Sequence, residues 1–237
     1  MRILMISDVF FPRINGVSTS IQTFRNDLQA QGHEVFLIAP LYPIRHDPDF
    51  VENDTRIFRI PSRGLAFDPE DRMMRFSEVM KLKNELSRLK IDLIHIHTPF
   101  VAHYAGIKLA KALAVPCVAT YHTLFEEYLS HYLPWVPQQL LRFATRHFST
   151  RQCNQVAGVI SPSSLIVTLL QRYGVMKNII TLPTGIVAAD FEHGDGEGFR
   201  RKLGIHPDKK VLVNVSRIAF EKNIGLLLLM FKELHDR

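Results

Sequence analysis

Short runs of apolar residues alternate along the chain with longer stretches in which apolar residues recur every three or four positions. Such runs are typical of strands buried in a parallel sheet, and the longer stretches are typical of amphipathic helices. Strands are predicted at residues 2–6, 34–39, 57–60, 93–96, 117–120, 156–160 and 179–182. The alternation predicts an α/β fold, an open parallel sheet with helices on both faces.

The predicted helices begin and end at capping and breaking residues. Ser18 or Thr19 is expected to cap the first helix, which Gly32 ends. Asp68 or Pro69 is expected to open a long helix that runs to Leu89. Further helices are predicted at 105–114, 140–154 and 163–173. Each helix then connects two strands, and the loops that follow the strands gather at the sheet edge where such folds bind ligands.

A polar, glycine-rich segment at residues 190–198 interrupts this rhythm and is typical of a linker. A helix at 198–203, a strand at 210–215 and a helix at 223–234 are predicted after it. One strand and two helices cannot bury their own apolar faces. We therefore expect a first domain over 1–189, a linker over 190–198 and the incomplete start of a second domain over 199–237, with bare apolar surface at 226–231.

Composition narrows the class of protein. Hydrophobic residues make up 46% and charged residues 22% of the 237, which excludes a disordered tail or a fibre. The net charge of +6 suits anionic substrates or anionic lipid, and the scattered basic residues with no recognised motif argue against a nucleic-acid partner. Two cysteines make no disulfide framework, and no apolar run resembles a signal peptide or a membrane span. A cytoplasmic protein that meets a membrane only at its surface is expected.

The loop after the first predicted strand is a candidate phosphate site. Asn15, Gly16 and Val17 stand just before the first predicted helix. A glycine there lets backbone N–H groups approach a phosphate, and the helix dipole favours an anion. The loop lacks the spacing of a dinucleotide-binding fingerprint, so an ordinary strand-to-helix turn is the alternative.

A second candidate loop follows the predicted strand at 117–120. It concentrates polar and aromatic groups at Tyr121, His122, Thr123, Glu127 and Tyr128. Ligands of open α/β sheets meet loops of this kind, and the alternative is a packed loop in which His122 bonds to backbone. The adjacent residues Glu126 and Glu127 diverge, so they do not form the facing carboxylate pair of a glycosidase.

His95 and His97 are predicted to point to one face of a strand. A metal site with His103 or His122 as a further ligand is one interpretation. No carboxylate or cysteine spacing supports it, so a polar lining at the strand end is favoured and no bound metal is expected.

Two further groups of cations are candidates for binding anions. Arg217 and Lys222 follow the predicted strand at 210–215 and could clamp a diphosphate, or lie as solvated surface charges. Arg142 and Arg146 share a helix face beside Trp135, a pattern with which soluble proteins contact anionic membranes. An ordinary amphipathic helix is the alternative for the second group.

Taken together, these motifs resemble the GT-B glycosyltransferases of family 4. The resemblance runs in order through Asp8, Phe11-Pro12 and Asn15-Gly16-Val17, then Asp92 to Pro99, Thr120 to Thr123, Ser161 to Ser163, Pro183 to Ile186, Ser216-Arg217 and Glu221 to Ile224. The string from Tyr121 to Tyr132 is more similar to the bacterial glycolipid branch, whose members glucosylate diacylglycerol at a membrane surface. Mannosyl and galactosyl relatives carry similar strings.

The resemblance implies two Rossmann-like domains, a nucleotide-sugar co-substrate, retention of anomeric configuration and no cofactor or bound metal. It implies that the first domain binds the acceptor, while Gly16 offers its backbone to the donor diphosphate. His122 would contact the donor sugar, and Arg217 and Lys222 would stabilise the leaving diphosphate. The donor phosphate would serve as the base. The expected reaction is transfer of a hexose, from UDP-glucose above other donors, to a lipid such as diacylglycerol.

The chain departs from the family pattern at its C-terminal side. The family's two glutamates spaced eight apart, which hold the ribose and sugar, have no counterpart before residue 237. The chain alone is therefore expected to be inactive unless another chain supplies the missing half. A non-catalytic acceptor-binding or membrane-docking module is the alternative function, and a metal-dependent hydrolase at His95 and His97 is a third.

Overall fold

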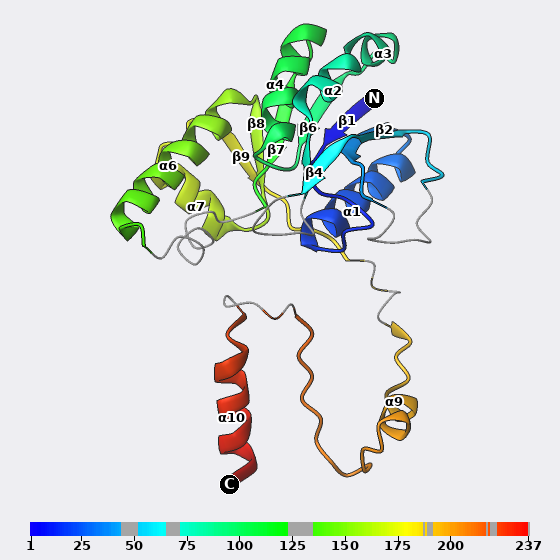
Figure 1. Cartoon of the computed structure of the whole chain (residues 1–237), viewed down its shortest axis with the longest axis vertical. Helices are drawn as coiled ribbons and strands as arrows, with labels where there is room; N and C mark the ends of the chain where they lie inside the picture. The colour runs from blue at the N-terminus through cyan, green and yellow to red at the C-terminus, as the bar shows by residue number, and fades with distance from the viewer. Residues whose placement is uncertain are drawn as a thin grey trace.

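The fold is that of the computed structural model, which describes residues 1–43, 52–64, 72–122, 135–186, 188, 192–216, 218 and 222–236. One parallel sheet of seven strands has the order β3-β2-β1-β6-β7-β8-β9 (Figure 1). The strands are β1 (Arg2–Ile6), β2 (Glu34–Pro40), β3 (Ile57–Ile60), β6 (Leu93–Ile96), β7 (Cys117–Thr120), β8 (Gly158–Ser161) and β9 (Asn178–Thr181). The predicted α/β fold is confirmed, and the seven strands predicted before the linker are all present, with their ends within about two residues.

Helices cover the two faces unequally (Figure 1). Helix α1 (Gly16–Ala30) packs with Met5, Val35 and Leu37 on one face. The other face, which includes Leu4 and Ile6, carries α2 (Phe76–Lys81), α3 (Lys83–Arg88), α4 (Val101–Leu113), α6 (Gln138–Gln155) and α7 (Ser164–Tyr173). Successive residues of β1 thus serve opposite faces, as the pleat of a strand requires.

The start of α1 differs from the prediction. The helix begins at Gly16, and Asn15 is its cap, because the Asn15 side chain accepts a hydrogen bond from the backbone N–H of Ser18 at 2.8 Å. The Ser18 hydroxyl instead donates to the carbonyl of Arg13. Either residue type can cap a helix, and the extended backbone at Asn15 decides between them.

The predicted long helix up to Leu89 is wrong at its start. Residues Arg72–Met74 form a strand, β5, antiparallel to β4 (Ser62–Gly64), and the helical part begins at Phe76 and divides at Leu82. The Arg72 guanidinium donates to the carbonyl and hydroxyl oxygens of Ser62. Strand pairing therefore overrides the local helical pattern. Asp68 and Pro69 lie outside the described residues.

The C-terminal part contains α9 (Gly196–Lys202), capped by Asp195, and α10 (Ile224–Asp236). The expected strand at 210–215 is absent from the described residues there, and so is any partner strand, without which an extended segment forms no ladder. No described residue from 192 onward is buried. The bare apolar surface expected at 226–231 is confirmed, because these residues of α10 are 44–66% exposed.

We expect Gly106→Ala to destabilise the first part of the chain. A Cβ atom on Gly106 of α4 would lie 2.7 Å from Cγ1 and 2.8 Å from Cδ1 of the buried Ile96 on β6. Such overpacking lowers the free energy of unfolding by about 1–3 kcal/mol. Urea unfolding followed by circular dichroism measures the loss.

The matched control is Gly16→Ala, because a Cβ atom at Gly16 has no heavy atom within 4 Å. The control should unfold at the wild-type urea concentration or slightly above it, since alanine favours a helix over glycine. Equal stability of the two variants would mean that α4 and β6 are not packed as described.

Candidate active site

The candidate site lies at the carboxyl ends of β1, β6 and β7. β1 pairs with β2 on one side and with β6 on the other, so the chain reverses its direction of growth between β1 and β6. Crevices form at such a reversal, and the loops that follow the strands border it. The loop 7–15, His97 and His122 follow β1, β6 and β7 in this way.

Gly16, the first residue of α1, has room for a ligand. It is exposed, its φ is not in the left-handed region and its missing side chain faces open space. The fold itself therefore has no need of a glycine at this position. The side chain of Asn15 caps the N–H of Ser18, and that of Val17 packs against the buried cluster under α1. The backbone N–H groups of Gly16 and Val17 have no hydrogen-bond partner among the described residues, so they are the groups that can meet an anion.

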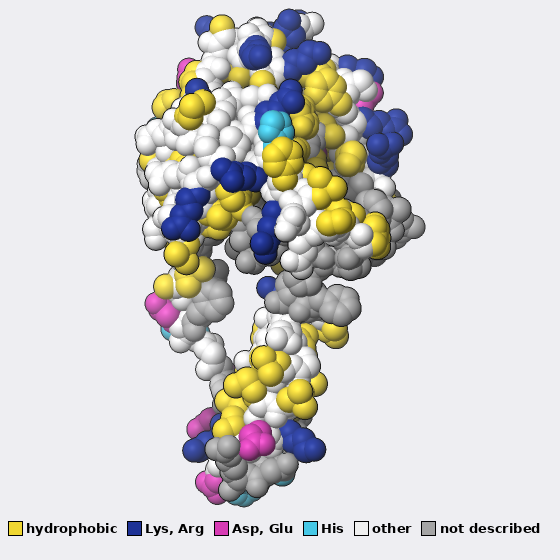
Figure 2. Space-filling model, turned by 90° about the vertical axis from the view of Figure 1, so that its left-hand side faces the viewer, with side chains coloured by type: hydrophobic (Ala, Val, Ile, Leu, Met, Phe, Trp, Pro, Cys, Tyr) yellow, Lys and Arg dark blue, Asp and Glu magenta, His cyan; other side chains and the backbone are white. Residues whose placement is uncertain are grey.

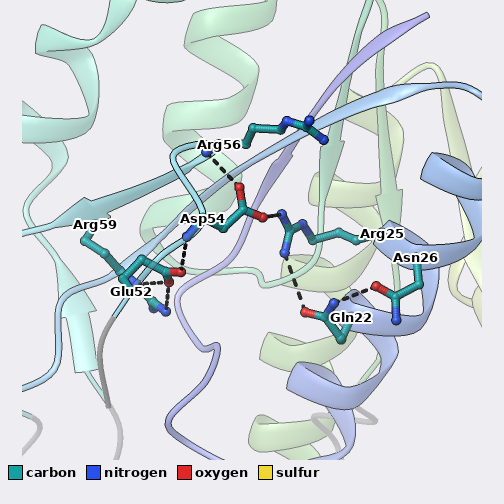
Figure 3. A network of polar contacts seen from close by, with 7 residues as sticks. All are labelled: Gln22, Arg25, Asn26, Glu52, Asp54, Arg56 and Arg59. Carbon is teal, nitrogen blue, oxygen red and sulfur yellow. Dashed lines mark hydrogen bonds and ion pairs between the residues drawn. The ribbon is translucent and has the colours of Figure 1, made fainter. Parts of the chain in front are cut away.

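A network of polar side chains fastens α1 to the segment before β3 (Figure 3). Arg25 on α1 is buried, and its Nη2 lies 2.6 Å from Oδ2 of Asp54. The backbone N–H of Asp54 donates to Glu52, whose other oxygen lies 2.6 Å from Nη2 of Arg59. The Arg59 guanidinium lies 5.5 Å from the ring centroid of Phe10 in the β1–α1 loop. The segment before β3 thus holds both α1 and the loop.

Three histidines form a buried cluster beside that helix. The rings of His95 and His97 lie 4.0 Å apart on one face of β6, which confirms the predicted shared face. His97 Nδ1 lies 3.1 Å from His122 Nε2, and His95 Nε2 lies 2.7 Å from the hydroxyl of Thr120. Phe24 of α1 covers the cluster with its ring edge-on to His95.

Burial keeps these histidines uncharged. It lowers the pKa of His95 to about 3 and that of His122 to about 4, and it holds the pKa of His97 well below the usual range. At neutral pH each ring therefore has one N–H donor and one acceptor nitrogen. The cluster can orient neutral hydroxyl groups and cannot supply positive charge to a phosphate.

Asp8 caps α4 from a distance in the sequence. Its Oδ2 accepts hydrogen bonds from the hydroxyl of Thr98 at 2.8 Å and from the backbone N–H of Ala102 at 3.0 Å. Phe100, at the N-cap position of α4, has no capping side chain of its own. Burial nevertheless raises the pKa of Asp8 to about 6. This role was missed from sequence, although a carboxylate directly after a buried strand is a signal for it.

The other predicted residues fall in several places. The hydroxyl of Tyr121 lies 3.0 Å from that of Ser149 on α6, so it ties the strand end to the helix. Lys222 is exposed just before α10. Thr123, Glu127, Tyr128 and Arg217 lie outside the described residues. Gly16, His97 and His122 thus follow neighbouring strands at one edge of the sheet, and the second candidate loop is described only as far as His122.

Within the described ranges, no group of three His, Cys, Asp or Glu side chains is placed to hold a metal ion. His103, considered as a further ligand, lies 3.0 Å through its Nε2 from Oε1 of Gln155.

Aromatic and basic side chains meet at the start of α6. Trp135 is 75% exposed, Phe143 69% and Leu140 57%, and Arg142 and Arg146 are exposed on the same helix. The Arg146 guanidinium also donates to the carbonyl of Arg172 at the end of α7. Figure 2 shows this flank, where yellow and dark blue side chains lie side by side and acidic ones are sparse. None of the helices in the described part of the chain has the length and apolar character needed to cross a bilayer.

Comparison with known proteins gives matches along nearly the whole chain. The pattern of Glycosyltransferase Family 4 matches residues 14–189. An alpha-monoglucosyldiacylglycerol synthase of Streptococcus pneumoniae is 34% identical over 99% of this chain and 53% of its own length. A GDP-mannose-dependent alpha-mannosyltransferase of Mycolicibacterium smegmatis is 28% identical over 96% of this chain and 59% of its own. The chain therefore spans a little over half the length of these relatives.

A solved structure supports the fold. The sucrose-phosphate synthase of Thermosynechococcus elongatus superposes with a TM-score of 0.70 at 18% identity, over 98% of this chain and 59% of that one. The fold is that of the GT-B glycosyltransferases, as predicted.

Acidification is expected to destabilise the domain through His95. Its pKa is about 3 in the folded chain against 6.5 for an unperturbed histidine, so the unfolded state takes up the proton first. The stability linked to this group is complete above about pH 6.5 and falls by about 1.4 kcal/mol per pH unit below it. Urea unfolding of wild type and of His95→Gln, from neutral pH to about pH 4, measures the difference.

Asp8 acts in the opposite sense, because its raised pKa favours the folded state at low pH. The test therefore compares how the free energy of unfolding changes with pH in His95→Gln and in wild type, since Asp8 contributes equally to both. His147→Gln, at an exposed position of α6, is the control and should keep the wild-type pH dependence. Parallel curves for wild type and His95→Gln would contradict a buried, neutral His95.

Proposed function

We propose that this chain, which belongs to Glycosyltransferase Family 4, contributes the acceptor-binding part of a retaining enzyme that transfers a hexose from a nucleotide-sugar to a lipid. The observation that supports the proposal is that the helix start at Gly16 and the His97–His122 pair follow the carboxyl ends of the neighbouring strands β1, β6 and β7. The first is suited to a diphosphate and the second to the hydroxyl groups of a sugar. UDP-glucose and diacylglycerol are the proposed substrates, because a synthase of glucosyldiacylglycerol resembles the chain along nearly its whole length.

In the proposed reaction the donor phosphate accepts the proton, and the protein binds the diphosphate and the sugar. The acceptor hydroxyl oxygen bonds to the anomeric carbon as the bond from that carbon to the diphosphate breaks, and the hydroxyl proton passes to a phosphate oxygen of the donor. The helix start at Gly16 binds the diphosphate through backbone N–H groups. His122 contacts the donor sugar, and Arg217 and Lys222 offset the charge that develops on the leaving group.

The acceptor side is proposed to include the loop that begins at Tyr121, with Thr123, Glu127 and Tyr128, while His97, predicted to bind substrate, lies behind it in contact with His122. The nucleoside pocket is assigned to a second domain that is proposed to begin near residue 199. Because the chain spans a little over half of its relatives, we assign activity to the chain only when that second half completes it, in the same polypeptide or as another chain. GDP-mannose is the alternative donor, suggested by the mannosyltransferase relative.

The lipid acceptor places the reaction at a membrane surface, and we propose a cytoplasmic enzyme that docks there through the start of α6. Trp135 and Phe143 would enter the interface, while Arg142 and Arg146 would attract anionic lipid. A docking module without catalysis is the second candidate, since this exposed surface does not require turnover.

Transfer of labelled sugar tests the enzyme. The test uses a hybrid enzyme in which residues 1–189 of this chain are fused to the C-terminal half of the Streptococcus pneumoniae synthase. The hybrid enzyme is incubated with UDP-glucose or GDP-mannose and with vesicles that contain diacylglycerol. His122→Ala is expected to lower kcat about a hundredfold, and Gly16→Ala to raise the KM for the donor, because a methyl group would occupy the space of the phosphate.

Lys83→Ala serves as the control and should leave transfer unchanged, since Lys83 is exposed on α3, away from the proposed site and docking surface. Wild-type rates in both His122→Ala and Gly16→Ala would contradict the proposed site. Glucolipid from UDP-glucose alone supports the proposed donor, and product from GDP-mannose alone would replace it.

Binding to vesicles tests the membrane surface with a natural reporter, because Trp135 is the one tryptophan of the chain. Vesicles with anionic lipid should shift the Trp135 emission to shorter wavelength, and salt should weaken the binding. Arg142→Gln is expected to reduce the affinity about fivefold, as each cation near the surface contributes about 1 kcal/mol. Lys83→Gln, an exposed cation on α3, is the control. An unshifted emission, or equal loss in both variants, would argue against docking through α6.

A further inference from the structure

The contact between His97 and His122 joins two residues with very different exposure. His97 is 1% exposed and His122 is partly exposed at the end of β7. The contact uses Nδ1 of His97 and Nε2 of His122, at 3.1 Å. The other nitrogen of His97, Nε2, is buried with no hydrogen-bond partner among the described residues. The His97 ring is therefore enclosed. Among the described residues, its ring forms a hydrogen bond only with His122, which lies at the edge of the sheet.

Two arrangements of protons satisfy a hydrogen bond between neutral imidazoles. In the first, His97 donates from Nδ1 and is left with an acceptor nitrogen at the buried Nε2. In the second, His122 donates from Nε2 and His97 is left with a buried N–H at Nε2. An N–H group buried without an acceptor is rarer in folded proteins than an underused acceptor. The first arrangement is therefore favoured.

We propose that His97 is a positioning residue that donates from Nδ1 to His122, and so fixes His122 as the tautomer with its proton on Nδ1. His122 then offers an N–H donor to the site, and its Nε2 lone pair is already engaged. A donor of this kind fits a sugar hydroxyl oxygen or a phosphate oxygen, and it leaves His122 without the free Nε2 that a base would use. This inference rests on the proposed function for the role of His122, and assigns His97 to holding it.

The surroundings of the pair keep both rings neutral and fixed. Burial opposes protonation of either ring, and the neighbouring His95 is held through its hydrogen bond with Thr120. Phe24 of α1 lies 6.0 Å from His97 between ring centroids, so the ring is confined on that side. None of the described residues forms a hydrogen bond with Nδ1 of His122, so that nitrogen is available to a ligand.

The tautomers can be read directly in the chain with 15N-labelled histidine. Two-bond 1H–15N correlation spectra at neutral pH distinguish a proton on Nδ1 from one on Nε2. We expect both His97 and His122 to carry the proton on Nδ1, and the exposed His193 provides an internal reference. A proton on Nε2 of His122 would overturn the proposal without any variant or activity assay.

Variants of His97 separate positioning from packing. His97→Asn keeps an N–H donor close to the place of Nδ1 and should keep the His122 tautomer, whereas His97→Phe keeps an aromatic ring and should lose it. His95→Gln, which alters the neighbouring ring alone, should leave the His122 tautomer unchanged. A retained tautomer in His97→Phe, with native backbone amide shifts, would show that His97 does not set it.

The transfer assay separates this inference from the proposed function. In the hybrid enzyme His97→Phe should lower kcat about tenfold, the loss of one hydrogen bond, and His97→Asn should restore most of it. Combined with His122→Ala, His97→Phe should cause no further loss. If the spectra show the expected tautomers while His122→Ala transfers sugar normally, the proposed function fails and the positioning remains. If His122→Ala is inactive and the tautomers differ, the positioning alone fails.

Discussion

The register between β1 and β6 is the constraint on which the candidate site depends. Ile3 lies opposite Leu93 and Ile6 opposite Ile96, and this pairing puts His95 and His97 on the face of α1. A slip of one residue would turn both histidines to the opposite face, among the buried side chains under α4. The same register brings Thr98 level with Asp8, whose carboxylate holds the first turn of α4. The packing of the sheet, the capping of α4 and the position of the histidine pair therefore all depend on the register between β1 and β6.

The histidines of the candidate site supply no positive charge, although the ligand proposed for the site is a diphosphate. They are neutral because they are buried, and the groups proposed to bind the anion are backbone N–H groups at the start of α1. A helix start contributes modestly to anion binding, typically about 1 kcal/mol or less at an exposed position. The cations that the resemblance assigns to the diphosphate, Arg217 and Lys222, belong to the C-terminal part. A firm hold on the donor thus requires both parts of the chain.

Local patterns predicted the strands well because each strand is a short apolar run between loops, and burial on both faces selects such runs. They failed where a contact distant in sequence decides the structure. Met73 fits a helical spacing, yet its segment pairs with β4. The extended segment at 210–216 has the composition of a buried strand, and it forms none in the described residues because no neighbouring strand is there to pair with it.

The fold class and the strands of the seven-stranded sheet could be predicted from periodicity, and the short motifs indicated the family and the loops that border the candidate site. How the candidate site residues are arranged depends on the tertiary structure. The His97–His122 contact joins residues 25 positions apart, and the bond from Ala102 to Asp8 spans 94. Such contacts depend on strand order, register and burial, which arise when the whole sheet assembles and which local propensity does not encode.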